Sequence, residues 1–363
     1  MRTTTLSDVA REAGVSLATA SRAINGSTNR TVGPALRERV LAAAARLHYS
    51  PDANAQAMAR GRTTSLGLIV HDIADPYFSA IAAGVTRAAE AAGLSVVLTS
   101  TEHDPAREVS FVELLRRQRV RAIVVTGGRR DDPEGTAALR EALEGFQAAG
   151  GSVALVSQPL EGMSTVVVDN REGAADLARH LHGIGYRRFA VVAGPVDHLT
   201  SRDRLSGFRE ALDELGAPLA EGTVVHSGFT RDGGYEGMAE LLRREARPEV
   251  VFAVNDVMAV GAMAASRDAG VAVPDDVAVA GFDDISTLRD ITPALTTVRV
   301  PLVEAGVLAT ELALGPGEPR EVHLAGEVVL RESTPPRQEV RPTPRAGGSG
   351  RHPAPEGPAD TPR

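Results

Sequence analysis

Apolar and polar positions alternate at helical spacing in the first fifty residues of the chain. One face of a first predicted helix is apolar, and it holds Leu6, Val9, Ala10 and Ala13. Thr5 and Asp8 form a capping pair at its start, and Gly14 can supply the positive φ that ends it. The pattern therefore predicts a short amphipathic helix followed by a tight turn.

Two further helices follow at close spacing. Ser16 is placed to cap the second helix, in which Ala20 and Ile24 face inward. Pro34 suits the first position of the third helix, whose buried stripe comprises Leu36, Val40, Ala44 and Leu47. The layout fits a plain three-helix bundle or a helix-turn-helix domain. The polar outer face of the second helix favours the helix-turn-helix, in which that helix enters the DNA major groove.

A corner and a short helical segment end this region. Tyr49-Ser50-Pro51 breaks the pattern, and Asp52 can cap a segment at 53–60. So short a helix is marginal alone in water, so we expect it to order only when something holds it. Met58 is its one large apolar side chain. It would pack against the twin helix of a dimer or enter the minor groove as a wedge between base steps.

From residue 66 onward the pattern changes to short apolar runs, each followed by an amphipathic helical stretch. Continuous Val-rich runs of this kind indicate parallel strands buried on both faces. Nine runs suit two doubly wound α/β domains better than one. The runs lie at 66–70, 95–100, 122–127, 152–157, 165–169, 189–194, 223–228, 250–256 and 277–284.

Polar and aromatic residues gather just after these runs. In parallel sheets, ligands bind at the carboxyl ends of the strands. The segments found there are His71 to Phe78, Asp169-Asn170, Gly194 to Arg204, Phe229, Asn255-Asp256 and Phe282 to Asp284. We expect the ligand site among them.

Charge is distributed unevenly along the chain. The net charge is −8, but residues 1–64 contain nine Arg and four acidic residues, so they carry +5 and the remainder −13. A basic head on an acidic body suggests a polyanion partner for the head. Cysteine is absent, which excludes disulfides and cysteine metal sites. No apolar run reaches the ~18 residues of a membrane span, and no signal peptide precedes the head, so we expect a cytoplasmic protein.

These residues together resemble the LacI/GalR family of transcription regulators. The resemblance covers about nine-tenths of the chain, from Thr5 to Pro336. Its most specific part is DVAREAGVSLATASRAIN followed by RERVLAAAARLHYSPDANAQAMARGRT. In the second half, GLIVHDIADPYF, VVVDNREGAADLARHL, DRLSGFREAL, NDVMAVGAM, VAVAGFDD, PALTTVRVP and LRESTPP are similar to the family's periplasmic-binding-protein-like sensor.

The resemblance implies DNA-contacting positions. Leu17, Ala18 and Arg22 match the positions that meet bases, and Arg22 suits a bidentate bond to guanine. Met58 matches the family's hinge wedge, which is usually Leu, and Gly33 replaces the usual cap Ser. The phosphate-contacting positions are matched by Thr5, Ser16, Thr19, Ser21 and Asn25.

The resemblance also implies an effector site. The aromatic positions of the cleft are matched by Tyr77, Phe78 and Phe229, and the polar anchors by Arg204, Asn255 and Asp283. Such groups suit sugar hydroxyls and the apolar edges of a sugar ring. Val300 stands where some sugar-binding members have Gln, and His198 stands where purine-responsive members have Arg, which argues against a purine.

The leading hypothesis is a dimeric repressor that binds a palindromic operator and responds to a small effector, a sugar or sugar derivative, without a cofactor, a metal or a membrane. The sequence does not indicate whether the effector releases the protein from DNA or strengthens its binding to DNA. Two alternatives are weaker. The first is a solute-binding protein that delivers its ligand to a transporter, which would need no basic head. The second is an enzyme, which is disfavoured because the chain lacks a G-x-S-x-G elbow and a phosphate-binding loop. His180 and His182 are not a metal pair, since i and i+2 face apart on a helix.

The expected domain division has four parts. The effector-binding and dimerisation domain would comprise two subdomains, and the tail, which has no Leu heptads, would be disordered and would favour a dimer over a tetramer. The expected ranges are 1–49 for the DNA-binding domain, 50–63 for the hinge, 64–160 plus 296–325 and 161–295 plus 326–336 for the subdomains, and 337–363 for the tail.

Overall fold

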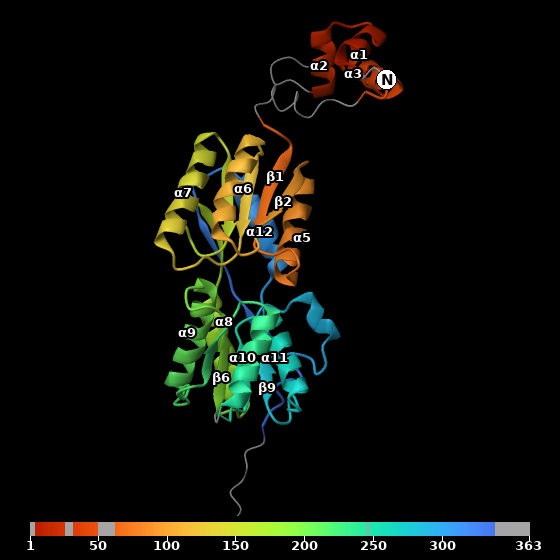
Figure 1. Cartoon of the computed structure of the whole chain (residues 1–363). Coiled ribbons are helices and arrows are strands. Elements are labelled where there is room, and N and C mark those ends of the chain that lie inside the picture. Colours follow the sequence, from red (N-terminus) through yellow and green to blue (C-terminus); the bar gives the residue numbers. More distant parts are fainter. Residues whose placement is uncertain (1–3, 26–31, 50–61, 245–246, 338–363) are drawn as a thin grey trace, which may run out of the picture.

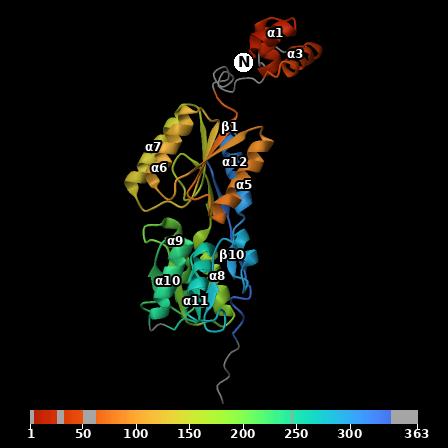
Figure 2. The ribbon, with the colours of Figure 1, turned by 45° about the vertical axis from the view of Figure 1, so that its right-hand side comes forward.

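The computed structural model describes residues 4–25, 32–49, 62–244 and 247–337. The first two ranges form a head of three helices, α1 (Leu6–Glu12), α2 (Leu17–Asn25) and α3 (Pro34–Arg46). The remaining ranges form a body of two lobes, each an α/β unit (Figures 1 and 2). Residues 50–61 of the hinge expected at 50–63, with Met58, and residues 338–363 of the expected tail lie outside the described residues.

The head forms as the sequence predicts. The backbone N–H of Thr5 donates to Asp8 Oδ2 at 3.0 Å, and Gly14 adopts a φ of +63° at the end of α1. The Ser16 hydroxyl accepts from the Thr19 backbone N–H at 3.2 Å and caps α2. One small core holds the helices together, and it contains Val9, Ala10, Ala13, Ala20, Ala23, Val40, Ala43 and Ala44.

The first lobe is a six-stranded parallel sheet between two helical layers. The strand order is β11-β5-β4-β3-β1-β2. Alternate residues of each strand face opposite layers, so Leu66, Leu68 and Val70 pack toward α5 and α12, and Ile69 packs toward α6 and α7. The strands are β1 (Ser65–Val70), β2 (Ser95–Ser100), β3 (Ala122–Thr126), β4 (Ser152–Val156), β5 (Ser164–Val168) and β11 (Glu321–Leu324), and the helices are α5 (Pro76–Ala91), α6 (Pro105–Arg117), α7 (Pro133–Ala148) and α12 (Leu302–Leu314).

The helices α5 and α12 cross at very close range. A Cβ at Gly84 would lie 2.0 Å from the Val303 carbonyl oxygen, and one at Gly306 would lie 2.2 Å from the Ile81 carbonyl oxygen. Only glycine fits at either position. The two helices, more than two hundred residues apart in sequence, therefore form one layer on the sheet.

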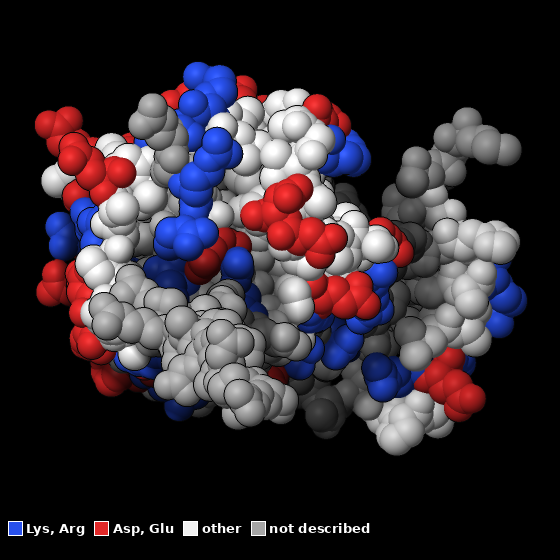
Figure 3. Space-filling model, turned by 90° about the horizontal axis from the view of Figure 1, so that it is seen from below, with Lys and Arg blue, Asp and Glu red and all other residues white. Residues whose placement is uncertain are grey.

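The second lobe repeats the plan with four parallel strands in the order β7-β6-β8-β9. Its strands are β6 (Phe189–Ala193), β7 (Val224–His226), β8 (Val250–Ala253) and β9 (Ala278–Ala280), and its helices are α8 (Asn170–Gly183), α9 (Leu199–Glu214), α10 (Arg231–Arg243), α11 (Asp256–Asp268) and the 3₁₀ turn η1 (Ser286–Asp290). All nine apolar runs are thus strands, as predicted. Arg and acidic side chains are interspersed over the end of this lobe that Figure 3 shows.

The chain crosses between the lobes three times, and the crossings differ from the expected boundaries. β5 pairs with β4 and β11 in the first sheet, so the first crossing follows Val168 and not residue 160. β10 (Thr297–Arg299) pairs antiparallel with β12 (Glu327–Val329), and Asp283 and Arg299 form an isolated bridge. The return crossing therefore follows Arg299 and not residue 295. The apolar pattern alone does not reveal which sheet a buried run joins.

Candidate DNA-binding face and effector cleft

The N-terminal turn of α2 presents apolar side chains outward. Leu17 is 51% exposed and Ala18 is also exposed, whereas Ala20 and Ala23 on the opposite face are buried in the head core. An exposed Leu at the start of a predicted recognition helix is available for apolar contact with a base. The packing of the head thus leaves the predicted base-contacting face free.

Arg22 lies one turn further along the same face. Its Nε donates to the Ala18 carbonyl oxygen at 3.0 Å. Its two terminal nitrogens make no hydrogen bond with the described residues, so they are available to a base edge.

The predicted phosphate-contacting residues make local bonds in the head. The hydroxyls of Ser16 and Thr19 lie 2.8 Å apart, and Asn25 Nδ2 donates to Ser21 Oγ at 3.2 Å. The Thr5 hydroxyl donates to Asp8 Oδ2 at 2.7 Å. These bonds account for local capping, and phosphate contact by the same groups stays a prediction.

All six predicted effector residues line one cavity between the lobes, which we call the inner chamber. It has a volume of about 420 Å³ including its mouth. The first lobe contributes Tyr77 and Phe78 from the first turn of α5, and the second lobe contributes Arg204, Phe229, Asn255 and Asp283. The structure therefore brings together, from five separate segments, the residues that the sequence singled out.

Arg204 is the central cation of the inner chamber and is only 2% exposed. Its Nε donates to Asn170 Oδ1 at 2.8 Å, its Nη1 to the Val254 carbonyl oxygen at 2.8 Å, and its Nη2 to Asp283 Oδ1 at 2.7 Å. Its guanidinium carbon also lies 3.8 Å from the centre of the Phe282 ring. Four contacts fix this charge in one orientation toward the cavity.

Asp283 and Asn255 are the polar anchors beside it. Asp283 has a φ of +121°, and its carboxyl is buried against Arg204, which leaves Oδ2 for a ligand. Burial raises the pKa of Asp283 above its ordinary value, and Arg204 opposes that rise. The side chain of Asn255 caps α11 by accepting from the Met258 backbone N–H at 2.9 Å. Its Nδ2 has no partner among the described residues and so remains a donor for a ligand.

Aromatic rings cover the sides of the inner chamber. Tyr77 and Phe78 meet edge to face with centroids 5.1 Å apart. Phe229 stacks on His198 at 4.3 Å. Flat apolar faces beside hydroxyl-binding groups are the usual lining of a small-molecule site.

Several lining residues were not among the predicted site residues. They are His71, Asp75, His103, Gly128, His198 and Thr200. Each follows or lies near the end of a strand. The principle that ligands bind at the carboxyl ends of parallel strands therefore predicts which segments line the cavity, but it does not predict which of their side chains do. Asp75 lines the chamber and also caps α5, since its Oδ1 accepts from the Tyr77 backbone N–H at 2.9 Å. Val300 does not line the chamber, and its backbone N–H donates to the Asp283 carbonyl oxygen at 3.3 Å.

His198 is held neutral in this cleft. Burial, followed by the nearby His71, Arg204 and Arg130, lowers its pKa to about 3. Its Nδ1 accepts from the Ser201 backbone N–H at 3.4 Å. The neutral ring therefore carries its proton on Nε2, where it is a hydrogen-bond donor.

A set of contacts joins the two lobes beside the chamber. Arg130 of the first lobe pairs with Asp197 of the second at 2.8 Å, and Asp131 pairs with Arg202 at 2.7 Å. The Asp131 backbone N–H donates to the Asp197 carbonyl oxygen at 2.7 Å. These contacts hold the cleft closed on one side.

The described residues also bear on two other kinds of site. Among these residues no group of His, Cys, Asp or Glu is arranged to hold a metal ion, and His180 bonds its own helix through Nδ1 to the Asp176 carbonyl oxygen. No helix in the described ranges is long and apolar enough to cross a membrane.

Comparison with known proteins decides the family. A family model for bacterial regulatory proteins of the lacI family matches residues 5–52, and a periplasmic binding protein-like domain matches residues 178–334. The HTH-type transcriptional regulator DegA of Bacillus subtilis is 32% identical over 92% of this chain and 98% of its own length. The chain belongs to the LacI family of transcriptional regulators.

Further relatives agree with this assignment. The ribose operon repressor of Escherichia coli K12 is 35% identical over 85% of this chain and 92% of its own length. The crystal structure of the lac repressor dimer bound to operator and the anti-inducer ONPF has 25% identity and a TM-score of 0.78, and the alignment covers 92% of this chain and all of that one. The predictions of a LacI-family regulator, and of a regulator instead of an enzyme, are confirmed.

Proposed function

We propose that this LacI-family regulator is a repressor that binds a palindromic operator as a dimer, and that a sugar or sugar derivative in the inner chamber controls its affinity for DNA. The observation that carries the proposal is the convergence of six predicted effector residues from both lobes on one cavity. Because it lies between lobes, a ligand there has different contacts in the open and closed cleft, as control of an equilibrium requires.

The head supports the DNA half of this proposal. Leu17 and Ala18 are exposed on α2, and Arg22 is half-buried one turn further along. The lac repressor, a similar structure, is described as a dimer on its operator. A two-fold dimer presents two such faces, which suits two half-sites related by a palindrome. Since an operator is DNA inside the cell, we expect the protein to act in the cytoplasm.

The chamber supports a sugar as effector. Arg204 and Asn255 offer donors, Asp283 and Asp75 offer acceptors, and aromatic rings flank them. Vicinal hydroxyls need donors and acceptors side by side, and sugar ring faces need apolar cover. A similar protein is named as a ribose operon repressor, which agrees with this class of ligand.

The linkage from chamber to head would run through the first lobe. Arg62, the first described residue of the expected hinge, donates to the carbonyl oxygens of Arg121 and Ala149, and the Thr63 backbone N–H donates to the Arg119 carbonyl oxygen. The start of the body is thus attached to the first lobe. Movement of that lobe on cleft closure would change the spacing of the two hinges in a dimer, and ligand and DNA would be coupled reciprocally.

The test is a DNA-binding titration with and without ligand. An operator would be selected from random duplexes with the purified full-length chain, and its affinity measured by fluorescence anisotropy at ~0.15 M salt, where non-specific binding is weak. We expect a palindromic site and a change in affinity with one member of a sugar library. The sign of the change distinguishes induction from co-repression. A preferred site without dyad symmetry, or DNA affinity indifferent to every ligand that binds the body, would refute the proposal.

A further inference from the structure

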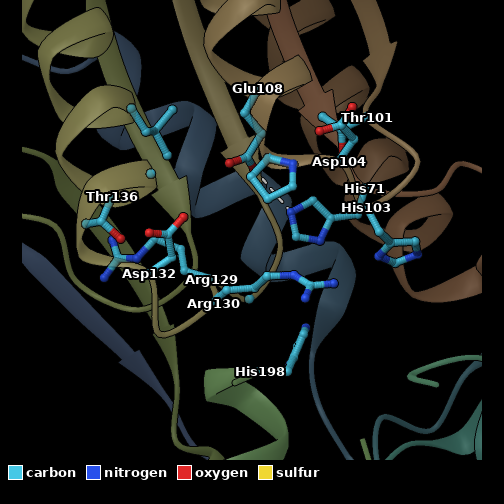
Figure 4. Close-up of a pocket in the computed structure, with 14 residues that line it drawn as sticks. His71, Thr101, His103, Asp104, Glu108, Arg129, Arg130, Asp132, Thr136 and His198 are labelled. Carbon is cyan, nitrogen blue, oxygen red and sulfur yellow. Dashed lines mark hydrogen bonds and ion pairs between the residues drawn. The ribbon is translucent and has the colours of Figure 1, made fainter. Parts of the chain in front are cut away.

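A second cavity, which we call the outer chamber, adjoins the inner chamber (Figure 4). It has a volume of about 550 Å³ including its mouth. The two chambers share four lining residues, and these are His71, His103, Gly128 and His198. Because the chambers share these residues, the effector site as first described is only one part of a larger cleft.

The walls of the outer chamber come mainly from the helix starts of the first lobe. Asp104 caps α6 through Oδ1, which accepts from the Ala106 backbone N–H at 3.0 Å, and Asp132 caps α7 in the same way toward Glu134 at 3.1 Å. In Figure 4, Asp132 and Thr136 line one side and His198 enters from the second lobe. Each capping carboxyl keeps its second oxygen available as an acceptor.

The lining of the outer chamber contains buried polar atoms without partners. Within the described part of the chain, four buried side-chain atoms lack a hydrogen bond, and three of them belong to this lining, namely Thr101 Oγ1, Arg129 Nε and Arg129 Nη1. Thr101 is fully buried. The Arg129 side chain is held only at Nη2, which donates to the Pro159 carbonyl oxygen at 2.6 Å. Buried polar groups are nearly always paired in native proteins, so such a concentration points to a ligand with acceptor oxygens.

The charges of the outer chamber argue for a neutral ligand. Its two Arg face three acidic residues, Asp104, Glu108 and Asp132. Arg130 is already paired with Asp197, and His71 Nε2 lies 3.1 Å from Glu108 Oε1. A phosphate or carboxylate would meet these carboxylates without a surplus of positive charge. Hydroxyl groups, which both donate and accept, suit the mixture.

Gly128 marks the junction of the two chambers. A Cβ there would lie 2.2 Å from Thr200 Oγ1 and 3.0 Å from His198 Cε1. The second lobe thus packs directly on Gly128, and only glycine allows the two lobes to meet at this point between the chambers.

We propose that the effector is a neutral two-unit glycoside, with one sugar ring in the inner chamber and the second in the outer chamber, joined across the lining that the two chambers share. Arg129 and Thr101 would serve the second ring, and the two capping carboxylates would accept from its hydroxyls. This inference rests on the proposed sugar-sensing function and narrows its ligand class.

The first experiment compares ligands of one and two units by isothermal titration calorimetry on the full chain. The panel comprises glucose, galactose and ribose, the disaccharides cellobiose, lactose, maltose and melibiose, and the anionic sugars glucose 6-phosphate and glucuronate. We expect one disaccharide to bind about ten-fold or more tightly than either component monosaccharide, as two or three additional hydrogen bonds would produce.

Three variants locate the second ring. Thr136→Phe fills the outer chamber and should weaken the disaccharide by about ten-fold, while monosaccharide affinity changes little. Thr101→Val should weaken the disaccharide several-fold without lowering the melting temperature of the free protein, because the lost hydroxyl has no partner there. Ala137→Phe adds the same bulk at an exposed position of α7 and should change neither affinity.

The outcomes separate this inference from the proposed function. If a monosaccharide binds as tightly as every disaccharide that contains it, or if Thr136→Phe and Thr101→Val leave disaccharide affinity unchanged, the outer chamber is not a sugar subsite, although sugar sensing stands. A clear preference for glucose 6-phosphate or glucuronate overturns the neutral second unit. Should no sugar of the panel bind, sugar sensing itself fails. Should Thr136→Phe not fold, Thr101→Val alone decides.

Discussion

The head and the body keep their functional residues in opposite environments. In the head, Leu17 is 51% exposed and faces solvent before any DNA arrives. In the body, Arg204 and Asp283 are 2% and 4% exposed and bond each other. A DNA face can be displayed on a rigid surface because the phosphates of DNA supply most of the affinity. A small ligand supplies few contacts, so its site must be built in advance inside the protein.

The two regions also differ in how they are held together. Six of the eight buried residues of the head core are Ala, and small side chains bury little apolar area. The body instead encloses large rings such as Phe208, Phe252 and Phe282. We therefore expect the head to unfold first and the body to resist, and the following changes test that difference from the largest effect to the smallest.

Arg204→Met should have the largest effect on the body. It leaves Asp283 buried without its cation, and breaking a buried ion pair from one side costs ~3–5 kcal/mol. Ligand binding should be lost and the main calorimetric transition lowered, while the head is unaffected. Arg171→Met removes an Arg that is 56% exposed and pairs with Glu210, so it should cost at most ~1 kcal/mol. If the two variants lost equal amounts of unfolding free energy, the assigned role of Arg204 would be contradicted.

Val40→Ala tests the small core of the head. Val40 is fully buried, and deletion of its two methyl groups should cost roughly 1–3 kcal/mol. A domain of this size with an alanine-rich core has little stability to spare. We expect operator binding in a gel-shift titration to fall to the non-specific level, with ligand affinity by calorimetry unchanged. Retained operator binding would show that the head is more stable than its core suggests.

Arg22→Met separates recognition from folding within the same head. The loss of a bidentate guanine contact is worth ~1–3 kcal/mol of discrimination between bases. Anisotropy titrations should show a weaker operator complex and an unchanged random-duplex complex. The matched variant Arg46→Met removes a cation that is 59% exposed and pairs with Glu12 of α1. If it lowers operator preference as much as Arg22→Met does, Arg22 does not contact a base.

The contrast between the regions also explains what the sequence could predict. Most of the nine apolar runs are strands buried on both faces, which have a continuous apolar pattern, whereas β2 and β7 lie at sheet edges and are partly exposed. β10, β11 and β12 were not predicted, since each is only three or four residues long and β11 and β12 contain exposed or half-buried positions. β5 was given to the wrong subdomain because an apolar run does not encode its neighbour in the sheet.

The site was predicted in outline for similar reasons. The six effector residues were found because they match family positions, and the chamber confirms that they lie together. The outer chamber was not foreseen, since Thr101 and Arg129 carry no sequence signal and are notable only for lacking partners after folding. The bond from Arg204 to the Val254 carbonyl oxygen is likewise invisible in a sequence, because any residue supplies a carbonyl.

The last effect that we expect is a dependence of the stability of the body on pH, through His198. Its pKa is lowered to about 3 in the folded protein, so between pH ~6.5 and ~3 the unfolded chain binds a proton that the native chain does not. Stability must then fall as the pH falls through this window, by at most ~1.4 kcal/mol per unit from this group. His198→Gln removes the titrating group and keeps a hydrogen-bond donor. As the pH falls from 7 to 4.5, the unfolding free energy of the variant should therefore rise relative to that of the wild type. Urea titrations at several pH values measure the unfolding free energy of both proteins. If the two free energies change with pH in parallel, His198 is not held neutral by the closed cleft.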